Sequence, residues 1–346
     1  MIFSSDNWAG AHPAIAESLV THAAGYASAY GTSELDRTVE KKFSEIFEKD
    51  VAVFFVGTGT AANALALSSA NRAGGIAFCH REAHVNVDEC GAPSFFSHGA
   101  RLCPVGGERG RMDPAKLEAG IRRFPKENVH GGQPMAVTLT QATESGTVYS
   151  LDQIESIGSV ATAHELPLHM DGARFANALV SLGTTPAEMT WKRGVDLLSF
   201  GGTKNGCWCA EALVLFDRSR AQQMHFLRKR SAQLFSKSRF VAAQFDAYLT
   251  GDLWLDLARQ ANAGRPVRRI SHRRSLARSR PSSQRNGAAP RRRHHCLGGE
   301  PACLDAGCQR GLRRAETRGG EPAAGAGRPF LRLGRAARSR GQPGGQ

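Results

Sequence analysis

One lysine in a glycine-rich loop is the first candidate for chemistry. Lys204 lies in the segment SFGGTKNG (199–206), between the apolar run VDLL and the strand-like segment EALVLF. A lysine amine has a pKa of about 10.4 in water, and nearby positive charge or burial can lower it enough to make the amine a nucleophile. From this loop alone three roles stay open for Lys204: a phosphate-binding ammonium, a surface charge on a turn, or a nucleophile that forms a covalent bond.

A second glycine-rich turn could bind an anion. Gly57-Thr58-Gly59-Thr60 follows the apolar segment VAVFFV and precedes an Ala/Leu-rich segment, so we expect it at a strand-to-helix junction. The free N–H groups and the dipole at a helix start favour phosphate, and Thr60 adds a hydroxyl donor. A Walker loop is followed by a lysine, and this turn is not. The turn also lacks the third glycine of a dinucleotide-binding fingerprint. A simple glycine turn with a threonine cap is the alternative.

Three further side chains follow expected strands. Asp171 closes the segment PLHMD, where a carboxylate could pair with a protonated ring nitrogen, and Arg174 could present a planar fork to a substrate carboxylate. The alternative is that Asp171 caps the next helix and Arg174 lies on its surface. His84, in REAHVNVDECG, could stack on a flat ring and transfer protons, or it could be an ordinary loop histidine. The order of the phosphate turn, His84, Asp171 and Lys204 in one α/β unit favours the nucleophile role for Lys204.

These residues require a sheet covered by helices. Segments with strand and helix patterns alternate through residues 30–216, which is typical of an α/β domain with a largely parallel sheet. Apolar residues at helical spacing predict a helix through Leu35, Val39, Phe43, Ile46 and Phe47. Further helices are expected after residue 57, over 151–165, over 174–183 and in two or three segments of 219–263. Strands are expected at 51–56, 76–79, 135–141, 167–171, 195–200 and 211–216.

The net charge of +14 comes from one end of the chain. Residues 264–346 contain twenty arginines, no lysine and four acids, whereas residues 1–263 contain 25 basic and 27 acidic residues. This Arg/Gly/Pro-rich composition predicts a disordered tail or an out-of-frame translation of GC-rich DNA. Such a tail could bind nucleic acid non-specifically through phosphates.

Other classes of site are not expected. The spacing of Cys296, Cys303 and Cys308 fits no common zinc site, so no metal is predicted. No run of about 18 apolar residues occurs and the N-terminus does not read as a signal peptide. We therefore expect no contact with membranes and a cytoplasmic protein with reduced thiols.

The motifs taken together resemble the threonine aldolase branch of the β-eliminating lyase family, from about Phe3 to Ala263. They are FSSDN, YGTSELDRTVEKKFSEIF, GTGTAANALAL, EAHVNVDECGAP, TQATESGTVYSLDQI, HMDGARFANALVSLG and SFGGTKNG. The resemblance implies an aspartate-aminotransferase-type α/β fold (fold type I) with a mainly parallel seven-stranded sheet. It implies an N-terminal arm at 1–30, a large cofactor-binding domain at 31–225 and a helical link at 226–263. The family's small C-terminal domain is expected to be missing or replaced by residues 264–346.

The resemblance also implies pyridoxal 5′-phosphate as the cofactor. Gly59 and Thr60 would then hold the cofactor phosphate, and His84 would stack on the pyridine ring. Asp171 would pair with the ring nitrogen, and Lys204 would form the Schiff base.

The implied reaction is the aldol cleavage of L-threonine, L-allo-threonine or a related L-3-hydroxy-α-amino acid to glycine and an aldehyde. Ser5 and Arg174 would bind the carboxylate of the amino acid. Glu144 stands where many members have a histidine, so the base for the β-hydroxyl proton stays open among His84, Glu144 and water. A homo-oligomer, tetrameric or dimeric, is implied. Another lyase reaction or a racemisation with the same cofactor is one alternative, and an inactive or nucleic-acid-binding chain is another.

Overall fold

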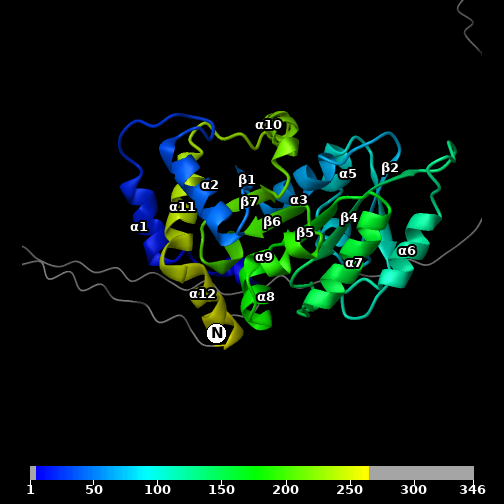
Figure 1. Ribbon diagram of the computed structural model, residues 1–346. Coiled ribbons are helices and arrows are strands. Elements are labelled where there is room, and N and C mark those ends of the chain that lie inside the picture. The colour runs from blue at the N-terminus through cyan, green and yellow to red at the C-terminus, as the bar shows by residue number, and fades with distance from the viewer. Residues whose placement is uncertain (1–4, 265–346) are drawn as a thin grey trace, which may run out of the picture. The chain divides into compact units, whose positions relative to one another are not determined.

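A seven-stranded sheet forms the centre of the computed structural model, which describes residues 5–264 (Figure 1). The predictions for residues 265–346 lie outside the described residues. The strand order is β1-β7-β6-β5-β4-β2-β3, and every strand predicted from the sequence is present. The bounds are β1 (Ala52–Val56), β2 (Gly75–His80), β3 (Arg101–Val105), β4 (Gln133–Thr140), β5 (Leu168–Gly172), β6 (Leu197–Gly201) and β7 (Glu211–Leu215).

The sheet is mostly parallel, as predicted, with one exception. Strands β2 to β6 pair in parallel where they are neighbours, whereas β7 is antiparallel to both β1 and β6. Because β7 reverses direction between them, β1 points the same way as β6. The carboxyl ends of six strands and the amino end of β7 therefore meet at one edge of the sheet, where ligands bind in open α/β sheets.

Helices connect the strands and cover the sheet (Figure 1). None of the helices within residues 5–264 is long and apolar enough to cross a membrane. The domain boundaries expected at residues 30, 225 and 263 stay predictions. The helices are α1 (Pro13–Thr21), α2 (Glu34–Ile46), α3 (Gly59–Ser68), α4 (His84–Val87), α5 (Ala92–Phe96), α6 (Pro114–Arg122), α7 (Leu151–Ala163), α8 (Phe175–Leu182), α9 (Pro186–Met189), α10 (Ala221–Arg230), α11 (Arg239–Leu249) and α12 (Leu253–Asn262).

Local sequence explains the predicted helix at α2. Ser33 and Asp36 form a capping box that satisfies the first free N–H groups of the helix. Val39 and Phe43 on its apolar face are fully buried, and Phe47 at the C-cap joins them. The helix thus buries the stripe that the periodicity predicted.

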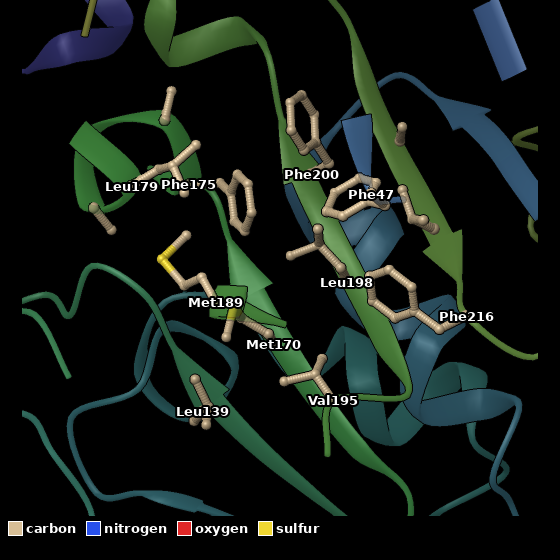
Figure 2. Close-up of a cluster of buried hydrophobic side chains, with 14 of the residues drawn as sticks. Phe47, Leu139, Met170, Phe175, Leu179, Met189, Val195, Leu198, Phe200 and Phe216 are labelled. Atoms are coloured by element: carbon tan, nitrogen blue, oxygen red, sulfur yellow. The ribbon is translucent and has the colours of Figure 1, made fainter. Parts of the chain in front are cut away.

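An aromatic cluster fixes the end of β6. The Phe200 ring lies 5.1 Å from Phe43 and 5.4 Å from Phe175, centroid to centroid, and Trp254 of α12 adds a third contact at 5.7 Å. Figure 2 shows Phe200 and Phe175 together with Phe47 in this buried layer. Because Phe200 is the penultimate residue of β6, this packing positions the loop that carries Lys204.

Candidate active site

A pocket of about 310 Å³ lies at the edge where the parallel strands end. It brings together five residues predicted from the sequence: Gly59, Thr60, His84, Asp171 and Lys204. A larger open hollow of about 790 Å³ between the end of α1 and the start of α2 contains none of them. The lining residues of the smaller pocket are Asn7, Gly57, Thr58, Gly59, Thr60, Asn63, His84, Asp171, Ala173, Thr203, Lys204 and Glu211.

The start of α3 forms the anion-binding side of this pocket. The Thr58 hydroxyl accepts a hydrogen bond from the N–H of Ala61 at 3.1 Å, which makes Thr58 the N-cap. Gly59 and Thr60 line the pocket, and within residues 5–264 their N–H groups, at the start of the helix, have no hydrogen-bond acceptor. A side chain at Gly57 would meet the Phe235 ring at 2.9 Å and would have to displace it. The threonine cap expected as an alternative is present, and it leaves the anion site open.

His84 begins the short helix α4 instead of lying in a loop. Its Nδ1 lies 2.8 Å from Oε1 of Glu89, whose side chain is fully buried. The hydrogen bond to Glu89 raises the pKa of His84 despite partial burial, and the charges of Asp171 and Glu144 act in the same direction. The structure describes no partner for Nε2 within residues 5–264, so this nitrogen is available to a ligand.

Asp171 is the fourth residue of β5 and is 2% exposed. Its Oδ2 accepts a hydrogen bond from Asn63 Nδ2 at 3.0 Å, and its Oδ1 accepts one from the N–H of Ala173 at 3.1 Å. The N-cap of the next helix, α8, is Arg174, so Asp171 is not a helix cap. A buried carboxylate with two donors at a strand end is suited to hold a positive charge in the pocket.

Lys204 lies in a single 3-10 turn, Thr203–Asn205, directly after β6. The side chain of Asn205 anchors the turn, because it donates to the Tyr248 hydroxyl at 2.6 Å and to the Trp254 carbonyl at 2.9 Å. Within the described part of the chain, Lys204 has no carboxylate within 4 Å. Its amine is therefore held at the pocket by a rigid turn without being tied to a counter-ion.

Glu211 is a pocket residue that the sequence reasoning missed. It opens the antiparallel strand β7 and pairs in register with Val56 of β1 and Gly201 of β6. Its Oε1 accepts a hydrogen bond from the N–H of Thr203 at 3.3 Å, and its Oε2 lies 4.0 Å from where a side chain on Gly59 would begin. Burial raises the pKa of Glu211 to about 7. The available signal was an acid at the first position of an otherwise apolar strand.

Two more buried residues were missed. Asn63 of α3 and Glu89, which follows α4, are 2% and 4% exposed and connect His84 with Asp171 through hydrogen bonds. The only signals in the sequence were an asparagine inside an apolar helix and an acid five residues after His84.

Ser5 and Arg174 are absent from the described lining of this pocket, although their neighbours Asn7 and Ala173 belong to it. The Ser5 hydroxyl accepts a hydrogen bond from the N–H of Asn7 at 3.2 Å. The Arg174 Nε donates to Asp6 Oδ2 at 2.8 Å, and its Nη1 lies 3.8 Å from Glu144 Oε2. Three charged side chains thus form a rim beside the pocket.

Comparisons with known proteins point to one group of enzymes. The chain is 42% identical to a low-specificity L-threonine aldolase of Pseudomonas sp. (strain NCIMB 10558) over 261 residues, which are 75% of each chain. The solved structure of the threonine aldolase of Leishmania major matches with a TM-score of 0.70 and 26% identity over 75% of both chains. An aspartate aminotransferase of Thermus thermophilus matches with a TM-score of 0.58 at 15% identity, over 74% of this chain and 66% of that one, which shows the fold alone. The predicted fold type I is confirmed.

The cofactor of β-eliminating lyases and of aminotransferases of this fold is pyridoxal 5′-phosphate. The residues present suit this group. The start of α3 offers N–H groups and open space to a phosphate, since a Cβ added at Gly59 would have Glu211 Oε2 as its nearest neighbour, 4.0 Å away. Asp171 offers a buried carboxylate to a protonated ring nitrogen, and Lys204 offers an amine to an aldehyde.

The family model described as β-eliminating lyase matches residues 3–301, which is most of the chain. This match agrees with the relatives in sequence and with the fold of the solved structures. The chain belongs to the β-eliminating lyase family of pyridoxal-phosphate enzymes.

Proposed function

We propose that this protein cleaves the Cα–Cβ bond of L-threonine, L-allo-threonine or a related L-3-hydroxy-α-amino acid, releasing glycine and an aldehyde. The activity named for the 42% identical relative supports this reaction. The observation that carries the proposal is the meeting of Lys204, Asp171 and His84 in one pocket beside the start of α3.

Three parts of the pocket would hold the cofactor. The N–H groups of Gly59 and Thr60 would bind its phosphate, because the start of α3 offers unpaired donors and a favourable dipole. Asp171 would keep the ring nitrogen protonated, and Lys204 would bind the aldehyde carbon through its amine. When bound, the cofactor supplies an electron sink for the pair released from the Cα–Cβ bond.

We propose that His84 is the base that accepts the β-hydroxyl proton. As the Cα–Cβ bond breaks, a C=O bond forms at Cβ and the hydroxyl proton moves to Nε2 of His84; a proton must then return to Cα before glycine leaves. His84 lines the pocket, whereas Glu144 lies 3.8 Å from Arg174 and outside the described lining. The raised pKa of His84 makes it a stronger base than an ordinary imidazole.

Arg174 and Ser5 are proposed to bind the substrate carboxylate at the rim. The Arg174 guanidinium can form two parallel hydrogen bonds with a carboxylate. It already holds the carboxylate of Asp6 in the described structure, at a side-chain exposure of 30%. A substrate would therefore compete with Asp6, or share the fork with it.

The product of the reaction tests the proposal. Purified full-length protein, loaded with pyridoxal 5′-phosphate, is incubated with L-threonine, and acetaldehyde, glycine, ammonia, 2-oxobutanoate and D-threonine are measured. We expect acetaldehyde and glycine in equal amounts, and neither product from Lys204→Ala. Ammonia with the oxo-acid would instead show β-elimination, and D-threonine would show racemisation; either result without acetaldehyde contradicts the proposal.

We also propose a homo-oligomer, a dimer or a tetramer, in the cytoplasm. Trp8 and Trp208 are 68% and 67% exposed on segments next to the pocket residues Asn7 and Lys204, and large exposed aromatic side chains of this kind are enriched in subunit interfaces. The five cysteines of the described residues are free thiols, which suits a reducing compartment. Light scattering on the eluting protein would test the assembly; a monomer at micromolar concentration would contradict it.

A further inference from the structure

Glu89 is buried beneath His84 and binds two donors with one oxygen. Its side chain is fully buried, and Oε1 accepts from Asn63 Nδ2 at 2.8 Å and lies 2.8 Å from His84 Nδ1. Glu89 lies outside both glycine-rich turns and is not one of the site residues predicted from the sequence. Burying a carboxylate costs free energy unless strong hydrogen-bond partners compensate, so the buried position of Glu89 needs an explanation.

The same amide group of Asn63 extends the contact to a second acid. Its Nδ2 also donates to Asp171 Oδ2 at 3.0 Å. His84, Glu89, Asn63 and Asp171 therefore form one continuous hydrogen-bonded chain, which we call the inner wall; all but Glu89 line the pocket. These residues come from α3, α4, the segment after α4, and β5, so the chain is a product of the tertiary fold.

Two atoms of this network are not satisfied. Oε2 of Glu89 and Oδ1 of Asn63 are buried and have no hydrogen-bond partner in the described structure. The network therefore has acceptor capacity beside the pocket that no protein donor within residues 5–264 uses.

The geometry determines which imidazole nitrogen carries the proton. An ionised carboxylate can only accept, and Glu89 Oε1 already accepts from Asn63 Nδ2, so we assign Nδ1 of His84 as the donor in the 2.8 Å contact. In the neutral ring Nε2 is then the unprotonated nitrogen, and it is the atom without a partner in residues 5–264. This is the arrangement by which a buried carboxylate orients a histidine base in hydrolases.

We propose that Glu89 is a positioning residue that holds His84 with its proton on Nδ1, so that Nε2 performs the proton transfer, and that Asn63 links this state to Asp171. The role in catalysis rests on the proposed function; the tautomer of His84 does not. The charged groups that face His84 are Glu89, Asp171 and Glu144, all acidic, and each raises the pKa of the imidazole. Lys204 and Glu211 line the same pocket.

The first test reads the His84 ring directly. Full-length protein labelled with ¹⁵N-histidine, with and without pyridoxal 5′-phosphate, is titrated by NMR, and His84→Gln identifies its signals. In the wild type we expect the Nδ1–H tautomer and a midpoint above that of an ordinary histidine. In Glu89→Gln we expect the midpoint to fall and the tautomer preference to weaken, because the amide no longer offers an anionic acceptor. A wild-type His84 with its neutral proton on Nε2 would overturn the proposal, whether or not any variant folds.

The second test separates positioning from folding. We expect Glu89→Gln to lower kcat for aldol cleavage by about 10- to 100-fold with little change in KM, because a wrongly oriented base loses part of the roughly 10²- to 10⁴-fold that general base catalysis contributes. Glu89→Asp, which keeps the charge, should restore part of kcat and the raised midpoint. Glu82→Gln is the matched control, since this acid lies on the same segment with its side chain 49% exposed, and it should leave both unchanged.

The outcomes distinguish the two proposals. If the wild type does not cleave threonine but His84 shows the expected tautomer and shift, the proposed function fails and the positioning role stands. If the wild type cleaves threonine and Glu89→Gln changes neither the His84 titration nor kcat, the positioning role fails alone.

Discussion

The inner wall and the outer rim of the pocket contain the same kind of contact in two different environments. In the inner wall, His84 Nδ1 lies 2.8 Å from Glu89; at the rim, Arg174 Nε lies 2.8 Å from Asp6. The two cations are similarly exposed, His84 at 28% and Arg174 at 30%, but the Glu89 side chain is fully buried whereas that of Asp6 is 35% exposed. Water and salt screen the rim pair, and burial strengthens the inner one.

This difference indicates that the inner wall and the rim have different functions. The acids of the inner wall are held in place before any ligand arrives, because Glu89 and Asp171 are buried and both accept hydrogen bonds from Asn63. At the rim, a carboxylate already occupies the arginine and can be exchanged for another at small cost, since exposed ion pairs contribute little. We therefore expect changes in the inner wall to affect the chemical step and changes at the rim to affect substrate affinity.

The largest effect is expected for Lys204→Ala, which removes the amine that lines the pocket together with the inner wall. We expect aldol cleavage to fall by roughly 10⁴-fold or more, because a covalent catalytic group is lost. The absorbance of lysine-bound cofactor in the visible spectrum should disappear as well. Lys192→Ala removes a lysine that pairs with Glu48 and Glu188 and does not line the pocket, so it should keep both activity and spectrum. An unchanged spectrum in Lys204→Ala would remove this residue from the site.

A second test replaces the acid at the end of β5. Asp171→Asn keeps the shape but not the charge that would hold the ring nitrogen protonated, so we expect kcat to fall by about 10²- to 10³-fold. Asp196→Asn is the matched control: Asp196 precedes β6 and accepts from the N–H of Leu168 at the other end of β5. It should reduce stability but not the kcat of the folded enzyme. Equal losses of kcat in both variants would mean that Asp171 is structural.

Glu211 predicts a pH effect on stability. Its folded pKa of about 7 lies above the ordinary value of 4.5, so the unfolded chain loses the proton first as pH rises. The free energy of unfolding should therefore fall between about pH 4.5 and pH 7, and Glu211→Gln should remove this fall and be more stable above pH 7 by up to about 3 kcal/mol. Urea unfolding at several pH values measures the difference. If the free energy of unfolding depends on pH in the same way in both proteins, the pKa of Glu211 is not raised in the folded state and the prediction is wrong.

The smallest effect is expected at the rim. Arg174→Lys loses the planar fork, and we expect KM for L-threonine to rise about tenfold with a smaller change in kcat. Asp6→Asn should change KM less, because it only frees the guanidinium. Arg218→Lys, an exposed arginine paired with Glu40, serves as the control. A loss confined to kcat in Arg174→Lys would contradict the division between inner wall and rim.

Much of the fold could be predicted because its signals are local. The apolar strands and the helix stripe of α2 follow from periodicity, and the strand-end residues Asp171 and Lys204 follow from the rule that parallel strands end at one edge. Strand β3 was missed because four of its five residues are partly or fully exposed, so the apolar pattern is weak. The helices α1 and α6 were missed too, although α6 has an Asp cap and a proline at its start.

The amino-acid sequence by itself determined the alternation of strands and helices, the two glycine-rich turns and the order of Gly59, Thr60, His84, Asp171 and Lys204 along the chain. These features depend on neighbouring residues, so a linear pattern is enough to find them.

Only the tertiary structure decided which other residues complete the pocket. Glu211 reaches the site because β7 is antiparallel, which brings an amino end to the edge where the other strands have carboxyl ends. Asn63 meets Glu89 and Asp171 across 26 and 108 residues of sequence. Strand direction and such distant contacts are determined by the packing of the whole sheet, and no local pattern contains them.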